Sequence, residues 1–149
     1  MAAIVLHILF RFLHIASVIL FLGGVVYARW VVAPTLATLP EDLQMHAAGD
    51  ARRRSRTSLY VLLILIVGSG LYNLLAGPQH GHMYHIVFGI KVLLVGDVLA
   101  AAVLWAIAPL YGDTATAPRN NRRLTHMAIV GILIVLISAY LRSLTQQGQ

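Results

Sequence analysis

The stretch that decides the fold runs from Ala2 to Val32 and reads AAIVLHILFRFLHIASVILFLGGVVYARWVV. It is long enough to cross a bilayer, because about 20 apolar residues suffice. Three polar residues interrupt it at i, i+4 and i+7, namely His7, Arg11 and His14, so they share one face of a helix. An ionisable residue within a membrane span is energetically expensive and usually faces the bundle interior. We therefore expect the other helices to gather around this polar face.

The composition of the whole chain also favours a membrane protein. Of its 149 residues, 59% are hydrophobic and 11% are charged, and the mean hydropathy is +0.81. Soluble domains contain about 25% charged residues. The chain has no cysteine, which excludes disulfides, thiolate metal sites and cysteine nucleophiles. The net charge of +6 comes from arginines in loops and at helix ends, so it reports membrane topology and does not indicate a nucleic-acid partner.

Four segments are long and apolar enough to span a membrane. They are roughly Ala3–Val32, Thr57–Ala76, His85–Leu110 and Leu124–Leu144. The apolar run of the first is too long for a signal peptide, and no basic residue precedes Arg11. The sequence thus predicts an all-α integral membrane four-helix bundle that forms a single domain over residues 1–149.

The connections between these segments predict the orientation. The first loop (34–56) and the third (111–123) contain seven arginines, which are Arg52, Arg53, Arg54, Arg56, Arg119, Arg122 and Arg123. The second loop (77–84) contains no lysine or arginine. By the positive-inside rule, the first and third loops are cytoplasmic and both termini lie outside. Within the first loop, residues 40–49 are expected to form a short interfacial helix.

Most polar groups of the four spans then fall in the outer half of the membrane. At about 1.5 Å per residue, His7 lies near the outer surface, His14 lies towards mid-membrane, and Lys91 lies roughly 9 Å below the outer boundary. Ser69 and Asn73, at i and i+4 on one face, belong to the same half. This shared depth is the reason for seeking a site there.

Other polar and aromatic residues lie deeper or at the inner surface. Asp97 is deeper and is expected either to carry protons or to bond a neighbouring helix. His126 is predicted at the inner surface, where the fourth segment begins, and so apart from His14. Tyr27, Trp30 and Trp105 are expected to be interfacial anchors.

A haem site is one interpretation of the outer polar groups. A neutral imidazole inside a helical bundle can be an axial ligand of haem iron, and cations such as Arg11 and Lys91 suit the propionates. Alternatively, His14 forms a hydrogen bond between helices and both cations extend outward. The candidate cofactor-binding residues are His7, Arg11, His14, Asn73, His85 and Lys91.

The outer loop Gln79–His85 offers a second kind of chemistry. Its imidazoles and thioether suit copper, because Cu(I) accepts Met and Cu(II) accepts His. Such a tract can also be merely solvated, and His85 can instead be a second axial haem ligand opposite His7 or His14. The candidate metal ligands are His7, His14, His80, His82, Met83 and His85.

Small residues in the spans predict close helix packing, since they let backbones approach in lipid. They are Gly23, Gly24, Gly68, Gly70, Gly89 and Gly96. The alternative is that glycine is simply common in membrane helices.

Several motifs resemble a known group of membrane proteins. The stretch from Arg11 through His14 to Gly24 and Tyr27 resembles the first helix of CopD-type copper-resistance proteins and of the related HemJ-type four-helix protoporphyrinogen oxidases. The segment Gly68-x-Gly70-Leu-Tyr72 is similar to the end of their second helix, and Gly89-Ile-Lys91-Val-Leu-Leu is similar to their third.

The resemblance implies a four-helix fold, His14 as a haem b ligand and Lys91 as its companion. Two positions depart from the HemJ pattern. Gly89 stands where that pattern has a histidine, and the fourth segment opens with Leu124-Thr-His126-Met-Ala in place of Asn-Glu-x-Pro. Protoporphyrinogen oxidation is therefore not among the expectations carried over.

The sequence as a whole predicts a multi-pass protein of the bacterial inner (plasma) membrane that binds haem b and transfers electrons. Its expected partners are the lipid bilayer and either a quinone or a periplasmic redox protein, in a homo-oligomer or a larger membrane complex. Two alternatives stay open: copper binding or transport of the CopD type, and a cofactor-free structural subunit. No hydrolytic motif is present.

Overall fold

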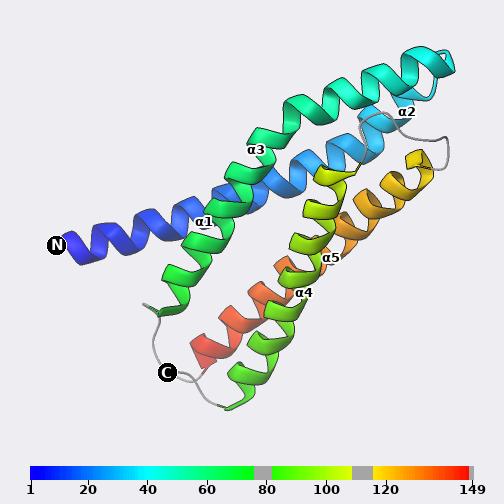
Figure 1. The fold of residues 1–149 in the computed structure, drawn as a ribbon. Helices are drawn as coiled ribbons and strands as arrows, with labels where there is room; N and C mark the ends of the chain where they lie inside the picture. The colour runs from blue at the N-terminus through cyan, green and yellow to red at the C-terminus, as the bar shows by residue number, and fades with distance from the viewer. Residues whose placement is uncertain (76–81, 109–115, 148–149) are drawn as a thin grey trace.

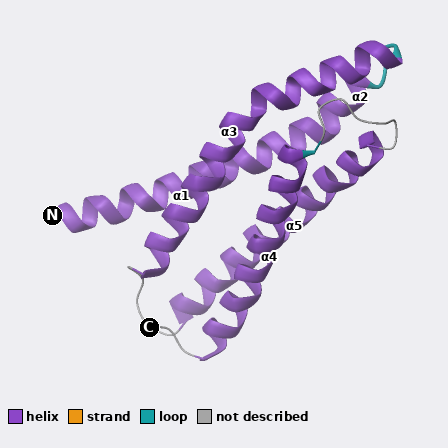
Figure 2. Ribbon diagram, viewed as in Figure 1, coloured by secondary structure: helices purple, strands orange, loops and turns teal. Residues whose placement is uncertain are grey.

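The computed structural model describes residues 1–75, 82–108 and 116–147, with only the backbone described at 2–3, 82–85, 116–117 and 144–147. The described residues form helices and no strands (Figures 1 and 2). In chain order the elements are α1 (Ala2–Tyr27), the π-helix η1 (Ala28–Val32), α2 (Ala33–Leu36), α3 (Glu41–Leu75), α4 (His82–Ile107) and α5 (Thr116–Gln147).

Four helical rods are long and apolar enough to cross a membrane. They are Ile4–Leu36, Glu41–Leu75, Ile86–Ile107 and Pro118–Ser143. Large apolar side chains are exposed on them, as at Ile64 (71% exposed) and Leu93 (76%), which is the pattern of helices that face lipid. The prediction of an all-α, multi-pass four-helix membrane protein is confirmed.

The bundle consists of two antiparallel helical hairpins. Helix α1 packs mainly against α3, and α4 packs mainly against α5, while contacts between α1 and α5 join the hairpins. Figure 1 shows α1 crossing α3 and α4 running beside α5. The predicted arginine-bearing regions meet at one end of the bundle, because Arg123 Nη1 donates to Leu104 O at 3.0 Å and the Arg52 guanidinium lies 5.3 Å from the Trp105 ring. The side of the membrane that this end faces remains a prediction.

The helices extend further than the four apolar segments of the sequence predicted. The first loop shrinks to residues 37–40, and α3 begins at Glu41, so the expected separate interfacial helix is the first part of α3. Likewise α5 begins at Thr116. The reason is that hydropathy marks only the part of a helix inside the hydrocarbon. At 35 residues, α3 is about 52 Å long, against about 30 Å of hydrocarbon.

The first rod contains one turn of π-helix where the sequence predicted its end. Pro34 has no N–H, and its ring clashes with the carbonyl four residues earlier, here that of Trp30. The wider turn avoids this clash, and the Ala33 N–H bonds to Ala28 O instead. The chain therefore continues as a helix through Leu36.

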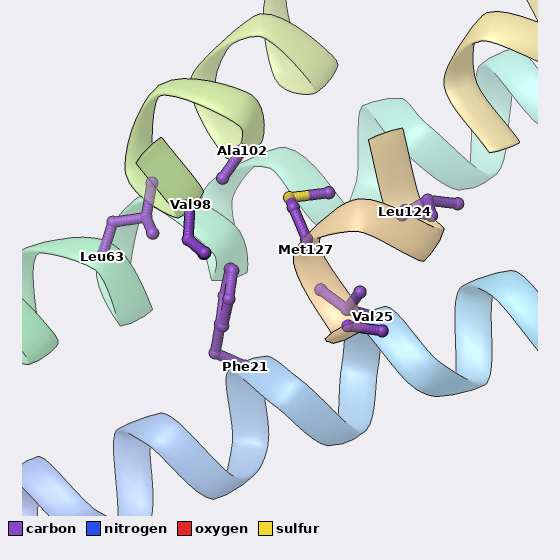
Figure 3. Close-up of a cluster of buried hydrophobic side chains, with 8 residues drawn as sticks. Phe21, Val25, Leu63, Val98, Ala102, Leu124 and Met127 are labelled. Carbon is purple, nitrogen blue, oxygen red and sulfur yellow. The ribbon is translucent and has the colours of Figure 1, made fainter. Parts of the chain in front are cut away.

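The apolar core lies where α1, α3, α4 and α5 converge (Figure 3). Met127 is 1% exposed, and Ala102 and Ala128 are fully buried. The residues that form this core are Phe21, Val25, Leu63, Val98, Ala102, Leu124, Met127 and Ala128.

Close packing at glycine occurs at two places. A Cβ on Gly70 would lie 3.1 Å from His14 Cε1, and one on Gly131 would lie 2.8 Å from Leu22 Cδ1. The predicted close contacts at the other glycines were wrong, because an added Cβ would meet nothing within 4 Å among the described residues. These glycines are Gly23, Gly24, Gly68, Gly89 and Gly96.

Candidate functional site

The imidazole of His14 is held by two groups of α3. Its Nδ1 lies 3.1 Å from Ile66 O and 3.1 Å from Ser69 Oγ. The Ser69 hydroxyl donates its own proton to Leu65 O, so at Nδ1 both neighbours act as acceptors. These contacts place the proton on Nδ1, and a neutral ring then keeps its lone pair on Nε2.

The crossing of α1 and α3 brings these groups together. Gly70 leaves room for the imidazole, because a Cβ there would lie only 3.1 Å from His14 Cε1. One turn away, the rings of Phe10 and Tyr72 stack at 4.1 Å between centroids. The close approach at Gly70 therefore makes room for the His14 ring, and the aromatic stack joins the same two helices nearby.

Two further predicted residues lie in the same half of the bundle. Lys91 of α4 is half-buried, and its charge acts on His14. Asn73 follows Ser69 by one turn on the same face of α3, and its Oδ1 is buried without a hydrogen-bond partner in the part of the chain that is described. Hydrogen-bonding capacity at Asn73 Oδ1 thus remains unused one helical turn beyond Ser69, the residue that contacts His14.

The rest of the polar stripe on α1 does not organise the bundle. Arg11 is exposed and His7 is half-exposed, and neither forms a hydrogen bond or ion pair with the described residues. Figure 1 shows the N-terminal end of α1 projecting away from the other helices. The expectation that all three residues face the interior was wrong for Arg11. The cause is that the apolar core gathers on the second half of α1, at Phe21 and Val25.

His7 and His14 also cannot bind opposite faces of one porphyrin. They project from a single helix and are separated by seven residues, or about 10.5 Å along its axis. A second axial ligand for a haem at His14 must therefore come from another helix, or be absent.

The predicted outer-loop ligands fall largely outside the described part of the chain. His80 lies outside it, as do the side chains of His82, Met83 and His85. The backbone of these last three residues belongs to the first turn of α4, which begins three residues earlier than predicted. Elsewhere, within the residues described, no three His, Asp or Glu side chains gather as a metal site. Copper binding by the outer tract stays a prediction.

Asp97 and His126 form an ion pair that the sequence analysis placed at two different depths. His126 Nε2 lies 2.6 Å from Asp97 Oδ2, with the side chains 49% and 50% exposed. The predicted start of the fourth segment at Leu124 was the source of the error. Because α4 ends at Ile107 and α5 begins at Thr116, both residues are ten positions from their helix ends and hence level. Asp97 thus bonds a neighbouring helix.

Two side chains at the arginine end contact other helices. Trp105 packs against the core with the Arg52 guanidinium over its ring, and its role as an interfacial anchor stays a prediction. Arg29 was not singled out, yet its Nε donates to Thr125 Oγ1 at 2.7 Å and links α5 to the first rod. The helical continuation through Pro34 places Arg29 within a span, and an intramembrane arginine was the available signal.

Fold and site together define a multi-pass α-helical membrane protein with a hydrogen-bonded histidine between two of its helices. Family models, curated proteins and solved structures give no match to this chain. The resemblance to CopD-type and HemJ-type proteins therefore continues to rest on the quoted residues alone.

Proposed function

We propose that this protein is an integral membrane haem b protein that transfers electrons, with His14 as an axial ligand through Nε2. The observation that carries the proposal is the pair of acceptors at His14 Nδ1, Ile66 O and Ser69 Oγ, each 3.1 Å away. A metal-binding histidine commonly donates its other ring N–H to a backbone carbonyl, which orients the ring and raises the basicity of the ligand nitrogen. A bound haem supplies a one-electron carrier.

The neighbouring residues fit the polar edge of such a group. Lys91 is half-buried and near enough for its charge to act on His14, which suits a propionate. Arg11, one turn from His14 on α1, is a second cation, and the unused Asn73 amide adds hydrogen-bonding capacity. The same proposal includes His85 as a second axial ligand. It also includes His7 as the ligand of a second haem nearer the membrane surface.

We place the haem in the outer half of a bacterial inner membrane. This setting combines the predicted orientation with the position of His14 on the side of the bundle away from the arginines. At that depth a quinone or a periplasmic redox protein can exchange electrons with the haem. No catalytic residue is proposed.

The same hydrogen bonds would also suit a purely structural link between α1 and α3, so the test must separate the two roles of His14. In His14→Asn, the side-chain amide lies near the former Nδ1 and can still donate to Ile66 O. It provides no imidazole lone pair. A structural role survives this change, whereas an axial ligand does not.

The experiment measures haem content and visible spectra of the purified protein and its variants. We expect a reduced b-type spectrum in the unchanged protein and loss of haem, or a high-spin spectrum, in both His14→Ala and His14→Asn. His7→Ala serves as the control from the exposed part of α1 and should change the spectrum less. Lys91→Ala should weaken haem retention without altering the ligand set.

Three results would count against this assignment. Full haem and an unaltered spectrum in His14→Asn would move the ligand elsewhere, with His85 and His7 as the next pair. Bound copper without haem would favour the CopD-type alternative. A colourless, metal-free protein that folds normally would favour a structural subunit.

A further inference from the structure

A cavity of about 580 Å³ lies in the arginine-bearing half of the bundle, away from His14. Its walls are mainly apolar and come from all four spans, and they include the core residues Phe21, Val25, Ala102 and Met127 (Figure 3). Hydroxyl groups of α3 line it as well, at Ser55, Thr57 and Ser58. The volume is in the range of small-molecule sites, and the walls suit an apolar group.

The cavity is accessible from the lipid side of the bundle. Several of its lining residues are exposed, among them Leu20, Gly24 and Val61, with exposed fractions of 64% at Leu20 and 50% at Val61. These residues belong to α1 and α3, so an acyl chain can enter laterally between those helices without crossing the core.

Three arginines converge at the end of this cavity, where α4 terminates. Arg52 Nη1 and Arg56 Nη2 both approach Ala108 O, at 3.4 Å and 3.5 Å. Arg123 Nη1 donates to Leu104 O one turn earlier, at 3.0 Å. The Arg52 guanidinium stands 5.3 Å from the ring of Trp105, and Trp105 lines the cavity. Arg52 is therefore next to the cavity through Trp105, and Arg56 and Arg123 directly precede the lining residues Thr57 and Leu124 in the chain.

The C-terminus of α4 neutralises only part of the positive charge of these three arginines. A helix C-terminus presents about half a negative charge, whereas three guanidinium groups bring three positive charges, which act on one another. Arg56 Nε is buried and has no hydrogen-bond partner in the described residues. Arg56 and Arg123 also have no carboxylate within ion-pair distance among those residues. The site thus combines an apolar cavity with cations that an external anion can satisfy.

We propose that this site binds an anionic phospholipid, with one acyl chain in the cavity and the phosphate group at Arg56 and Arg123. Charge complementarity selects this occupant, because anionic head groups collect at the cytoplasmic surface, where the arginine end is predicted to lie. A haem is the other amphiphilic anion to consider, but none of the lining residues is a histidine. The lipid site is independent of the haem proposed at His14.

Fluorescence quenching tests the site with defined lipids. In a Trp30→Phe background, Trp105 is the single tryptophan and reports on the cavity it lines. The protein is reconstituted in mixed phosphatidylglycerol and phosphatidylcholine vesicles in which one lipid or the other carries a brominated acyl chain. We expect brominated phosphatidylglycerol to quench Trp105 as if bound about 25-fold more tightly than phosphatidylcholine, which is about fivefold for each of the two arginines.

Matched variants separate the two parts of the site. Gly24→Leu should fill the cavity and remove most of the quenching, while Gly23→Leu should not. An added Cβ meets nothing within 4 Å at either position, but Gly24 alone lines the cavity. Arg56→Gln with Arg123→Gln should abolish the preference for phosphatidylglycerol, while Arg53→Gln with Arg54→Gln, at exposed positions of α3, should keep it.

The outcomes decide the proposal in both directions. Equal quenching by the two brominated lipids in the unchanged arginine background would overturn recognition of the head group. Unchanged quenching in Gly24→Leu would overturn occupancy of the cavity by an acyl chain. Helicity and gel-filtration profiles of every variant are checked first, and a variant that fails to fold is replaced by Ala28→Leu for the cavity, or by Arg56→Lys and Arg123→Lys, which should retain part of the preference.

Discussion

The two halves of this bundle are held together by different interactions. In the arginine-bearing half, apolar side chains from all four spans pack around Met127 and Ala102. In the opposite half, the described contacts between α1 and α3 include hydrogen bonds at His14 and one aromatic stack, and the end of α1 is exposed. The fold therefore depends mainly on the apolar packing of one half, and the hydrogen-bonding groups of the other half contribute less to it.

The energies expected of these interactions support that division. Truncating a fully buried Met to Ala typically costs about 2–5 kcal/mol. A hydrogen bond between membrane helices contributes about 0.6 kcal/mol on average, because the alternative states in the membrane also find partners. Changes at His14 should therefore affect the haem proposed there far more than the fold.

The first prediction concerns which half of the bundle faces the cytoplasm. It has the largest expected effect, because a reporter at a given site is either active or inactive. A reporter fused after Gln149 should be active outside and one inserted near Arg54 should be active inside, since the arginines near the start of α3 and of α5 favour the cytoplasm. Activity assays with paired reporters at each site provide the measurement. The opposite pattern at both sites would mean that the arginine end faces outside and the half with His14 faces the cytoplasm.

Met127→Ala should produce the largest loss of stability. We expect the free energy of unfolding to fall by about 2–5 kcal/mol, because the removed side chain leaves a cavity in the core. Unfolding titrations in detergent micelles measure the change. The control is Ile129→Ala, two positions along α5 and 61% exposed, which should change stability little. Equal losses would mean that the core is not formed as described.

The Asp97–His126 pair links α4 to α5 and should have an intermediate effect. Asp97→Ala, His126→Ala and the double variant form a cycle that isolates the coupling between the two side chains. We expect about 1 kcal/mol, within the range measured for polar contacts between membrane helices. A coupling close to zero would show that the two half-exposed side chains do not pair in the bilayer.

Ser69→Ala should have the smallest measurable effect, about 0.6 kcal/mol. The Ile66 carbonyl still accepts the Nδ1 proton of His14, so the ring keeps one of its two acceptors. Ser138→Ala provides the control, because that hydroxyl donates to Ile134 O of its own helix and links no second helix. If Ser69→Ala cost as much as Met127→Ala, the proposed division between the two halves would fail.

The candidate site was partly predictable. The spacing of Arg11 and His14, and the depths of Lys91 and Asn73, pointed to the half in which His14 meets Ile66 and Ser69, and the cofactor itself stays a prediction. The same reasoning failed at Asp97 and His126, because a misplaced helix start of eight residues shifts depth by about 12 Å. It also failed for five of six glycines, since glycine content does not tell which side of a helix meets a neighbour.

The amino-acid sequence alone was enough to predict four apolar helices, their place in lipid and the gathering of the arginines at one end. These properties follow from local composition and from the periodicity of a single helix, which need no knowledge of neighbours. The tertiary structure was needed to show that His14 meets Ile66 and Ser69, that Asp97 meets His126, and that the first half of α1 lies outside the core. Such pairings depend on how each helix is rotated and crossed against the others, and that is set by side-chain packing between segments far apart in the chain.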